Sequence, residues 1–457
     1  MIKAAFSALP AFFWGGRAIL IVGLACLSLS LSAQNQNAHW GMGQNVMIRF
    51  DDDAPPQILE SKVEFSDGPA ISDENGNLLF YLRPRCFNYP TDYEILPNRL
   101  FDYTNNLLNN SDSMDLLFNS TVIIPHYDID NNKFYLLLSI YDNTFDVERF
   151  SNDRFNFSLI KIEQETGLIQ LKKKNQVVLD GNFEWAISAS RHGNGKDWWI
   201  VVKSNLNNHV YLYLYDYSGI NHYATYEFGS VNSREGTQII PPSIIFNNQN
   251  NKLAILYSTH GTIDVFDFDS CTGTLSNKVQ LGYPPRNFYD HRRIIRGIAF
   301  SPNGKYLYCT QIDSLFQYNI NSTNPLLSKK IIYVDSFIQD SLMFGNEYFG
   351  STIEFLRMTQ GNDRKIYVGH VHITPEFTNE LILDSPHNLY LGVINNPDED
   401  GEACNFEWFG LFLNGKYSNW GRFPTLPVYA PKLLGVESQA GRDTFLCVGA
   451  SARLGSP

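Results

Sequence analysis

Two short stretches of the chain carry residue types that could bind a metal ion. His370 and His372 are two apart in a predicted strand, so both side chains project from one face, as metal ligands on a strand would. No third histidine or carboxylate lies at local ligand spacing, so we predict no metal site there. Asp398 and Asp400 precede Gly401 in a cluster of carboxylates that could wrap Ca²⁺. We keep this pair as a calcium candidate, with a solvated loop as the alternative, and predict no other cofactor.

Signatures of catalysis are absent from the sequence. It contains no GxSxG elbow, HExxH pair, P-loop, Rossmann glycine pattern or sialidase Asp-box, and no Cys/His spacing typical of zinc. Two carboxylates for glycoside chemistry need no fixed spacing, and the 47 Asp and Glu residues offer no way to choose a pair. We therefore predict no catalytic residue, while a carbohydrate-active enzyme stays open as an alternative.

The elements that must position any site are strands of a repeated module. Each copy has a short apolar strand, a polar turn often built on Asn-Gly-Lys, and a second, aromatic strand. The residue before the second strand recurs at intervals of 53 to 63 residues: Asn77, Lys133, Lys196, Lys252, Lys305 and Lys365. Alternating apolar residues continue into further strands, and no window keeps a helical period. A period of this length with several strands predicts an all-β β-propeller.

We expect seven blades, with six as the alternative. Six modules are visible, and two strand-like segments, Trp40 to Phe65 and Phe406 to Pro431, remain outside them. If N- and C-terminal strands share a blade, they close the ring and remove exposed strand edges.

Equivalent positions of the modules predict one shared ligand site. The loop leaving the second strand of each blade opens on the same face near the axis, where polar residues should converge. These positions carry donors and cations, which suit an acidic or hydroxyl-rich partner such as a surface glycan; the alternative is that they only cap strand ends. They are Arg83, Tyr141, Lys203, His260, Gln311 and His372.

The first 33 residues have the layout of a secretory signal. Lys3 and Arg17 precede an apolar run, and small residues follow before a polar stretch, so we expect cleavage after Ala33, a propeller over 34–435, and a secreted or cell-surface protein. The apolar run is shorter than a spanning helix needs, so no stable membrane span is expected after removal of the signal. Loss of the two basic residues changes the formal charge from −12 to −14, which argues against nucleic-acid binding.

Export would place the remaining cysteines in an oxidising compartment, where disulfides can form. Five cysteines follow the signal: Cys86, Cys271, Cys309, Cys404 and Cys447. We consider a Cys271–Cys309 bridge, because adjacent blades could bring these residues together, and expect Cys447 to be unpaired within the chain. Free, buried thiols are the alternative.

Nine motifs, in order, carry a resemblance to a known group of proteins. They are ISDENGNLLFY from Ile71, LPN from Leu96, NGKDWWIV from Asn194, VFDFDSCTGTLSN from Val265, FSPNGKYLY from Phe300, LFQYNI from Leu315, RKIYVG from Arg364, VINNPDEDGEACNF from Val393 and LPVYAP from Leu426. Over Trp40 to Pro431 the chain resembles the N-terminal β-propeller region of large secreted Bacteroidetes proteins of the type IX secretion and gliding-motility-associated group. It departs from them at Asp67-Gly68-Pro69-Ala70, where such proteins often have Glu-Gly-Cys-Ala.

The resemblance implies a non-enzymatic binding or scaffold module of a cell-surface or secreted multidomain protein. Its partner would be a surface glycan or another exported protein. Residues 436–457 then look like the start of an immunoglobulin-like or PKD-like repeat, with a disordered tail as the alternative. A secreted hydrolase or lyase acting on carbohydrate through carboxylates on one propeller face remains the second hypothesis.

Overall fold

The computed structural model describes most of the chain between Asn35 and Tyr429, and the predicted signal 1–33, the tail 436–457 and Cys447 lie outside the described residues. The described residues are 35–51, 54–83, 86–87, 95–96, 99–108, 121–126, 132–142, 153–181, 183–204, 206–228, 243–283, 294–334, 342–344, 347–349, 352–373, 386–416, 423–424 and 426–429.

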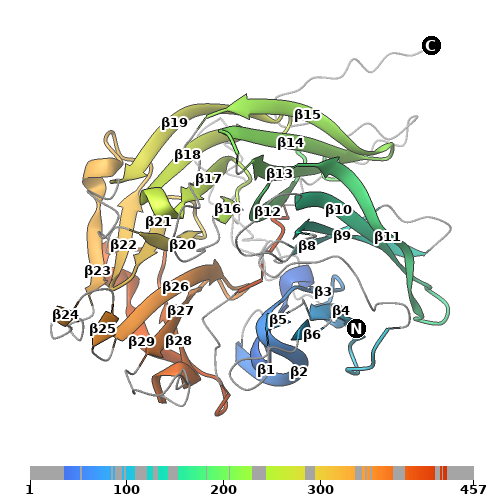
Figure 1. Ribbon diagram of the computed structural model, residues 1–457, viewed down its shortest axis with the longest axis horizontal. Coiled ribbons are helices and arrows are strands. Elements are labelled where there is room, and N and C mark those ends of the chain that lie inside the picture. The colour runs from blue at the N-terminus through green and yellow to red at the C-terminus, as the bar shows by residue number, and fades with distance from the viewer. Residues whose placement is uncertain are drawn as a thin grey trace, which may run out of the picture. The chain divides into compact units, whose positions relative to one another are not determined.

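The chain folds into an all-β β-propeller whose sheets follow one another in chain order (Figure 1). Five sheets have four strands each, ordered from the inner to the outer strand as β8 (Thr121–Pro125), β9 (Lys133–Asp142), β10 (Asp153–Ile162), β11 (Ile169–Asp180); β12 (Phe183–Arg191), β13 (Trp198–Ser204), β14 (His209–Asp216), β15 (Gly219–Glu227); β16 (Ser243–Phe246), β17 (Lys252–Tyr257), β18 (Thr262–Asp269), β19 (Thr274–Gly282); β20 (Ile295–Phe300), β21 (Tyr306–Gln311), β22 (Ser314–Asn319), β23 (Lys330–Val334); and β26 (Thr352–Gln360), β27 (Ile366–Ile373), β28 (Tyr390–Ile394), β29 (Phe406–Phe412).

A sixth sheet has three strands, and the remaining elements are short. The sixth sheet contains β3 (Ala70–Ser72), β4 (Leu78–Arg83) and β7 (Arg99–Asp102). Small strand pairs and 3₁₀ turns are β5 (Cys86–Phe87) with β6 (Ile95–Leu96), β24 (Leu342–Phe344) with β25 (Glu347–Phe349), η1 (Asn35–Asn37), η2 (Ser258–His260), η4 (Leu326–Ser328), η6 (Pro386–Leu389) and η7 (Gly401–Cys404). Within the described ranges, no helix has the length and apolar character needed to cross a bilayer.

Strand burial follows the position of each strand in its sheet. Every residue of β13 is buried, because Trp198, Ile200 and Val202 pack toward the preceding sheet while Trp199 and Val201 pack toward the following one. β15, the outer strand of the same sheet, alternates between intermediate and exposed residues. Core residues therefore lie between sheets, as the apolar second strands of the modules predicted.

The turn of each module is held by hydrogen bonds between residues that are close in the sequence. In the copy that joins β20 to β21, Gly304 adopts φ +67° and donates its N–H to the Ser301 carbonyl oxygen at 2.8 Å. The N–H of Lys305 reaches the Asn303 Oδ1 at 2.9 Å, so the asparagine side chain completes the turn. Glycine tolerates this left-handed backbone, which explains the Asn-Gly-Lys pattern.

The described residues form six blades, so our preferred count of seven is wrong and the alternative of six holds. β29 pairs with β28 as the fourth strand of its own module, and it does not share a blade with the N-terminal segment. β1 (His39–Asp51) instead pairs with β2 (Ala54–Gly68) in a separate two-stranded sheet. Among the described residues the predicted closing blade does not form, because β29 completes the sheet of its own module while β1 pairs with its sequence neighbour β2.

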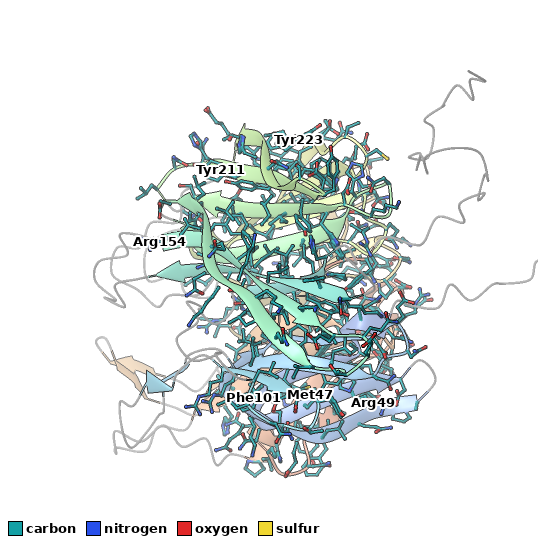
Figure 2. All side chains as sticks on the ribbon, turned by 90° about the vertical axis from the view of Figure 1, so that its right-hand side faces the viewer. Met47, Arg49, Phe101, Arg154, Tyr211 and Tyr223 are labelled. Atoms are coloured by element: carbon teal, nitrogen blue, oxygen red, sulfur yellow. The ribbon has the colours of Figure 1, made fainter. Side chains whose placement is uncertain are left out.

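The two-stranded sheet packs against both the first and the last blade. Met47 of β1 and Phe101 of β7 belong to one buried cluster, and both are labelled in Figure 2. On the other side, the Trp40 ring lies 5.6 Å from that of Tyr367 in β27, measured between centroids. Side-chain packing thus joins the N-terminal sheet to its neighbours.

The predicted Cys271–Cys309 bridge is also wrong. Cys309 and Cys404 are free and buried, whereas Cys271 is disulfide-bonded to a different residue. Cys309 points into the cluster between the β16–β19 and β20–β23 sheets, where burial raises its pKa to about 12 and keeps it a neutral thiol. Side-chain direction within β21 decided this outcome.

Candidate functional site

The six residues predicted to share a site all lie at the end of a second strand or just beyond it. Lys203 and His260 come close enough for the charge of Lys203, after burial, to lower the pKa of His260. Arg83 has Phe101 as a neighbour, 5.7 Å from its guanidinium to the ring centroid, and the ring of His372 lies 4.8 Å from that of His387. Gln311 ends β21, and Tyr141 lies in β9 with its side chain outside the described part of the chain.

Lys203 forms a buried ion pair that the sequence did not predict. Its Nζ lies 2.6 Å from Glu184 Oε1 and also donates to the Ser204 carbonyl oxygen at 2.9 Å. The two side chains are 0% and 2% exposed. Glu184 is the second residue of β12, and antiparallel pairing places the start of β12 beside the end of β13. Glu184 could have been identified from the sequence as a carboxylate near the start of a first strand.

A second ion pair, between a buried carboxylate and a partly exposed lysine, lies in the adjoining sheet. Asp264 of β18 is fully buried, and its Oδ2 lies 2.8 Å from Lys278 Nζ. Burial, then the negative charges of Asp264 and Glu184, raise the pKa of Tyr257 well above its usual range. Lys203 Nζ is 5.4 Å from the centre of the Tyr257 ring. Tyr257 therefore connects the two ion pairs, and we call Glu184, Lys203, Tyr257, His260, Asp264 and Lys278 the ion-pair cluster.

Buried charge is confined to one edge of the sheets. Antiparallel order puts the starts of first and third strands at the same edge as the ends of second strands. All five buried Asp, Glu, Lys and Arg side chains of the described ranges lie within three residues of such a strand end: Arg83, Glu184, Lys203, Asp264 and Arg296. Burying a charge is unfavourable unless it is paired, so this segregation marks the edge as a candidate site.

At the opposite edge, the buried polar groups are neutral. Ser190, near the end of β12, donates to the Asn250 side-chain oxygen, and Gln317 of β22 donates its amide to the Tyr308 hydroxyl at 2.7 Å. These amides and hydroxyls satisfy turns and neighbouring strands. The two edges therefore differ in chemistry, and the charged edge is the one that the six predicted positions share.

Hydroxyl groups line the charged edge beside the ion-pair cluster. Ser258 and Thr262 are buried, and their side-chain oxygens have no hydrogen-bond partner among the described residues. Ser258 begins η2, which carries His260, and Thr262 begins β18 just after it. A ligand hydroxyl or a water molecule would satisfy them.

His370 and His372 do not act as a pair. His370 is fully buried, and its Nε2 lies 2.9 Å from the His387 carbonyl oxygen while its ring stacks on Trp408 at 4.5 Å between centroids. Burial lowers the pKa of His370 to about 4, so the ring is neutral at pH 7. In the part of the chain that the structure describes, no group of three His, Cys, Asp or Glu side chains is placed to hold a metal ion.

The two calcium candidates, Asp398 and Asp400, both contact protein groups. Asp398 accepts the Asn303 N–H at 2.8 Å through Oδ1, and its Oδ2 lies 3.2 Å from the Arg364 guanidinium. Asp400 lies 2.6 Å from Lys330 Nζ. These carboxylates tie the last blade to a turn and to the outer strand of the blade before it.

No protein-family model matches the chain, and no curated protein matches it. Among solved structures it is similar to the periplasmic gluconolactonase of Pseudomonas aeruginosa, at 11% identity over 79% of this chain and 94% of that one, with a TM-score of 0.42. It is also similar to a functionally unknown protein of Desulfotomaculum acetoxidans, at 13% identity over 65% and 89% of the two chains, with a TM-score of 0.35. The Dos1 propeller matches at 13% identity over 71% and 70%, with a TM-score of 0.33. These similarities are too low to transfer a ligand, an activity or a partner.

Proposed function

We propose that the protein is an exported, non-enzymatic β-propeller that binds a hydroxyl-rich ligand, such as a surface glycan, at its charged edge. The observation that carries this proposal is the confinement of all five buried charged side chains of the described ranges to that edge. A fold stabilised by packing alone has no need to bury charge at one end of its strands. In this proposal the module belongs to a secreted or cell-surface multidomain protein, as the signal-like residues 1–33 support.

The chemistry of the edge suits sugar hydroxyls. The ion pairs of Glu184 with Lys203 and of Asp264 with Lys278 make this edge polar. The hydroxyls of Ser258 and Thr262, which have no hydrogen-bond partner among the described residues, can both donate to and accept from a ligand hydroxyl. Small-molecule sites commonly place a few such groups within otherwise apolar walls, and the sheets on both sides supply those walls.

A glycan-array screen of the purified chain tests the proposal. His260→Ala removes a half-buried side chain at this edge, and Lys196→Ala, in the β12–β13 turn at the opposite edge, is the matched control. We expect bound glycans with the parent chain and with Lys196→Ala, and at least a tenfold weaker signal with His260→Ala. Circular dichroism would verify that both variants fold. Equal binding by His260→Ala, or no binding by the parent chain, would contradict the proposed site.

A second candidate function is supported by one further observation. The carboxylates of Glu184 and Asp264 come from adjoining sheets, and both raise the pKa of Tyr257. Two carboxylates near one tyrosine could serve a carbohydrate hydrolase or lyase. Incubation with polysaccharides and detection of new reducing ends or unsaturated products tests this function. Product that disappears in Glu184→Gln and Asp264→Asn, but not in Lys196→Ala, would replace the binding-only proposal.

A further inference from the structure

A short segment near the C-terminus adds a strand to the first strand of the β12–β15 sheet. Val428 forms a parallel bridge with Ser190 of β12. The Val428 N–H donates to the Ala189 carbonyl oxygen at 2.9 Å, and the Arg191 N–H donates to the Val428 carbonyl oxygen at 2.9 Å. Because β13 occupies only one edge of β12, the segment 426–429 takes the other edge.

Side chains anchor the segment on both sides of β12. The Tyr429 ring lies 5.1 Å from that of Trp198, measured between centroids, in an edge-to-face arrangement. The Arg191 guanidinium lies 4.4 Å from the centre of the Trp198 ring and 5.8 Å from that of Tyr429. Val428 packs on the other side, against the cluster shared with the β16–β19 sheet. Aromatic and cation–π contacts thus hold one face of the added strand, and apolar packing of Val428 holds the other.

The residues just before this strand contact the N-terminal sheet. Asn37 donates its side-chain amide to the Pro427 carbonyl oxygen at 2.9 Å. The Phe423 ring lies 6.0 Å from that of Trp40, and Leu426 packs into the same cluster as Trp40. Residues 423–424 and 426–429 therefore connect β1 and the last blade to the blade that begins with β12.

We propose that the free edge of β12 is an acceptor site for an extended peptide, and that the chain's own 426–429 segment fills it as a strap. β-Strand addition of this kind recognises a peptide through its backbone and selects it through side-chain pockets. Here the backbone partners are Ala189 and Arg191, and the Trp198 face selects an aromatic residue at the position of Tyr429. The strap thereby links the N-terminal sheet and the last blade to the third blade in chain order.

The acceptor site is separate from the charged edge. Ala189 and Arg191 end β12, whereas Glu184 lies near its start, so the strap contacts the opposite end of the strand. The inference therefore does not depend on the proposed ligand, and loss of the strap should leave the ion-pair cluster in place.

Two full-length variants and one control test the acceptor site. Val428→Pro removes the N–H that Ala189 accepts, and Tyr429→Ala removes the ring on Trp198. Tyr429→Phe keeps that ring and is the matched control. In Val428→Pro and Tyr429→Ala we expect hydrogen exchange of the Arg191 amide to accelerate at least tenfold, while the Ile200 and Val201 amides within β13 stay protected. Tyr429→Phe should exchange like the parent chain.

A labelled synthetic peptide of residues 423–432 provides the second measurement. We expect it to bind the Val428→Pro variant in fluorescence anisotropy, and not the parent chain, whose site is filled. Unchanged protection of Arg191 in both variants would overturn the proposal, as would a Val428→Pro chain that stays folded and does not bind the peptide. A parent chain that forms dimers in light scattering, and loses them with Val428→Pro, would show that a second copy supplies the strap and would overturn the assignment within one chain.

Discussion

Replacement of Lys203 by methionine is expected to destabilise the protein strongly. Lys203 Nζ lies 2.6 Å from Glu184 Oε1, and both side chains are almost fully buried. Methionine is about as long as lysine but carries no charge, so the Glu184 carboxylate would lose the cation that neutralises it. Removing one partner of a buried ion pair costs about 3–5 kcal/mol. The surviving carboxylate would either protonate or pull water into the core.

Urea unfolding followed by tryptophan fluorescence measures this loss. The double variant Lys203→Met/Glu184→Leu should regain most of it, because an apolar pair needs no counter-charge. Lys252→Met is the matched control: the Lys252–Asp267 pair lies in the next sheet but is partly exposed, so its loss should cost about 1 kcal/mol or less. The reasoning is refuted if Lys203→Met costs no more than Lys252→Met, or if the double variant is as unstable as the single one.

Three further outcomes are expected. The pKa of His370 is about 4 in the fold and 6.5 in an unfolded chain. The neutral ring therefore contributes fully to the free energy of unfolding above pH 6.5, and this contribution falls by up to about 3 kcal/mol as the pH drops toward 4. His370→Gln should lose less stability than the parent chain between pH 7 and 4 in urea titrations, and an equal loss would contradict this. Gly297→Ala should lower the free energy of unfolding by about 1–3 kcal/mol in the same assay, because the new Cβ would lie 2.7 Å from Arg357 Cα and Leu356 O. An unchanged free energy of unfolding would contradict this close approach of β20 and β26. Asp398→Asn should lower Tm by about 2 °C or less, equally with and without calcium, since the Asp398–Arg364 pair is partly exposed. A calcium-dependent rise in Tm that this variant abolishes would contradict this expectation and support the calcium site.

The modules were predictable because their strands pair within a short stretch of chain. In the copy from Gly297, β20 to β23 follow in order, and the turn at Ser301 to Lys305 depends on side chains that the sequence shows directly. The pairing of the segment 426–429 could not be predicted in the same way. The 426–429 segment and β12 are more than two hundred residues apart, and only packing decides that this segment pairs with β12 and not with β1.

The candidate site was only partly predictable for a similar reason. Choosing the residue where each second strand ends identified Lys203 and His260, which the structure brings together. It missed Glu184 and Asp264, because the starts of first and third strands were not included in the count. It also did not foresee that Tyr257 would connect two ion pairs from adjoining sheets.

By itself the sequence determined the propeller, through a repeat of strands and turns whose hydrogen bonds are local and whose apolar second strands must be covered on both faces. The tertiary structure alone decided the blade count, the partner of β1, the free thiol of Cys309 and the pairing of Lys203 with Glu184. Each of these depends on which side chains and strand edges meet across the fold. A repeat shows that its copies are alike, but the burial of charge and the choice of edge partner arise only when the copies pack together.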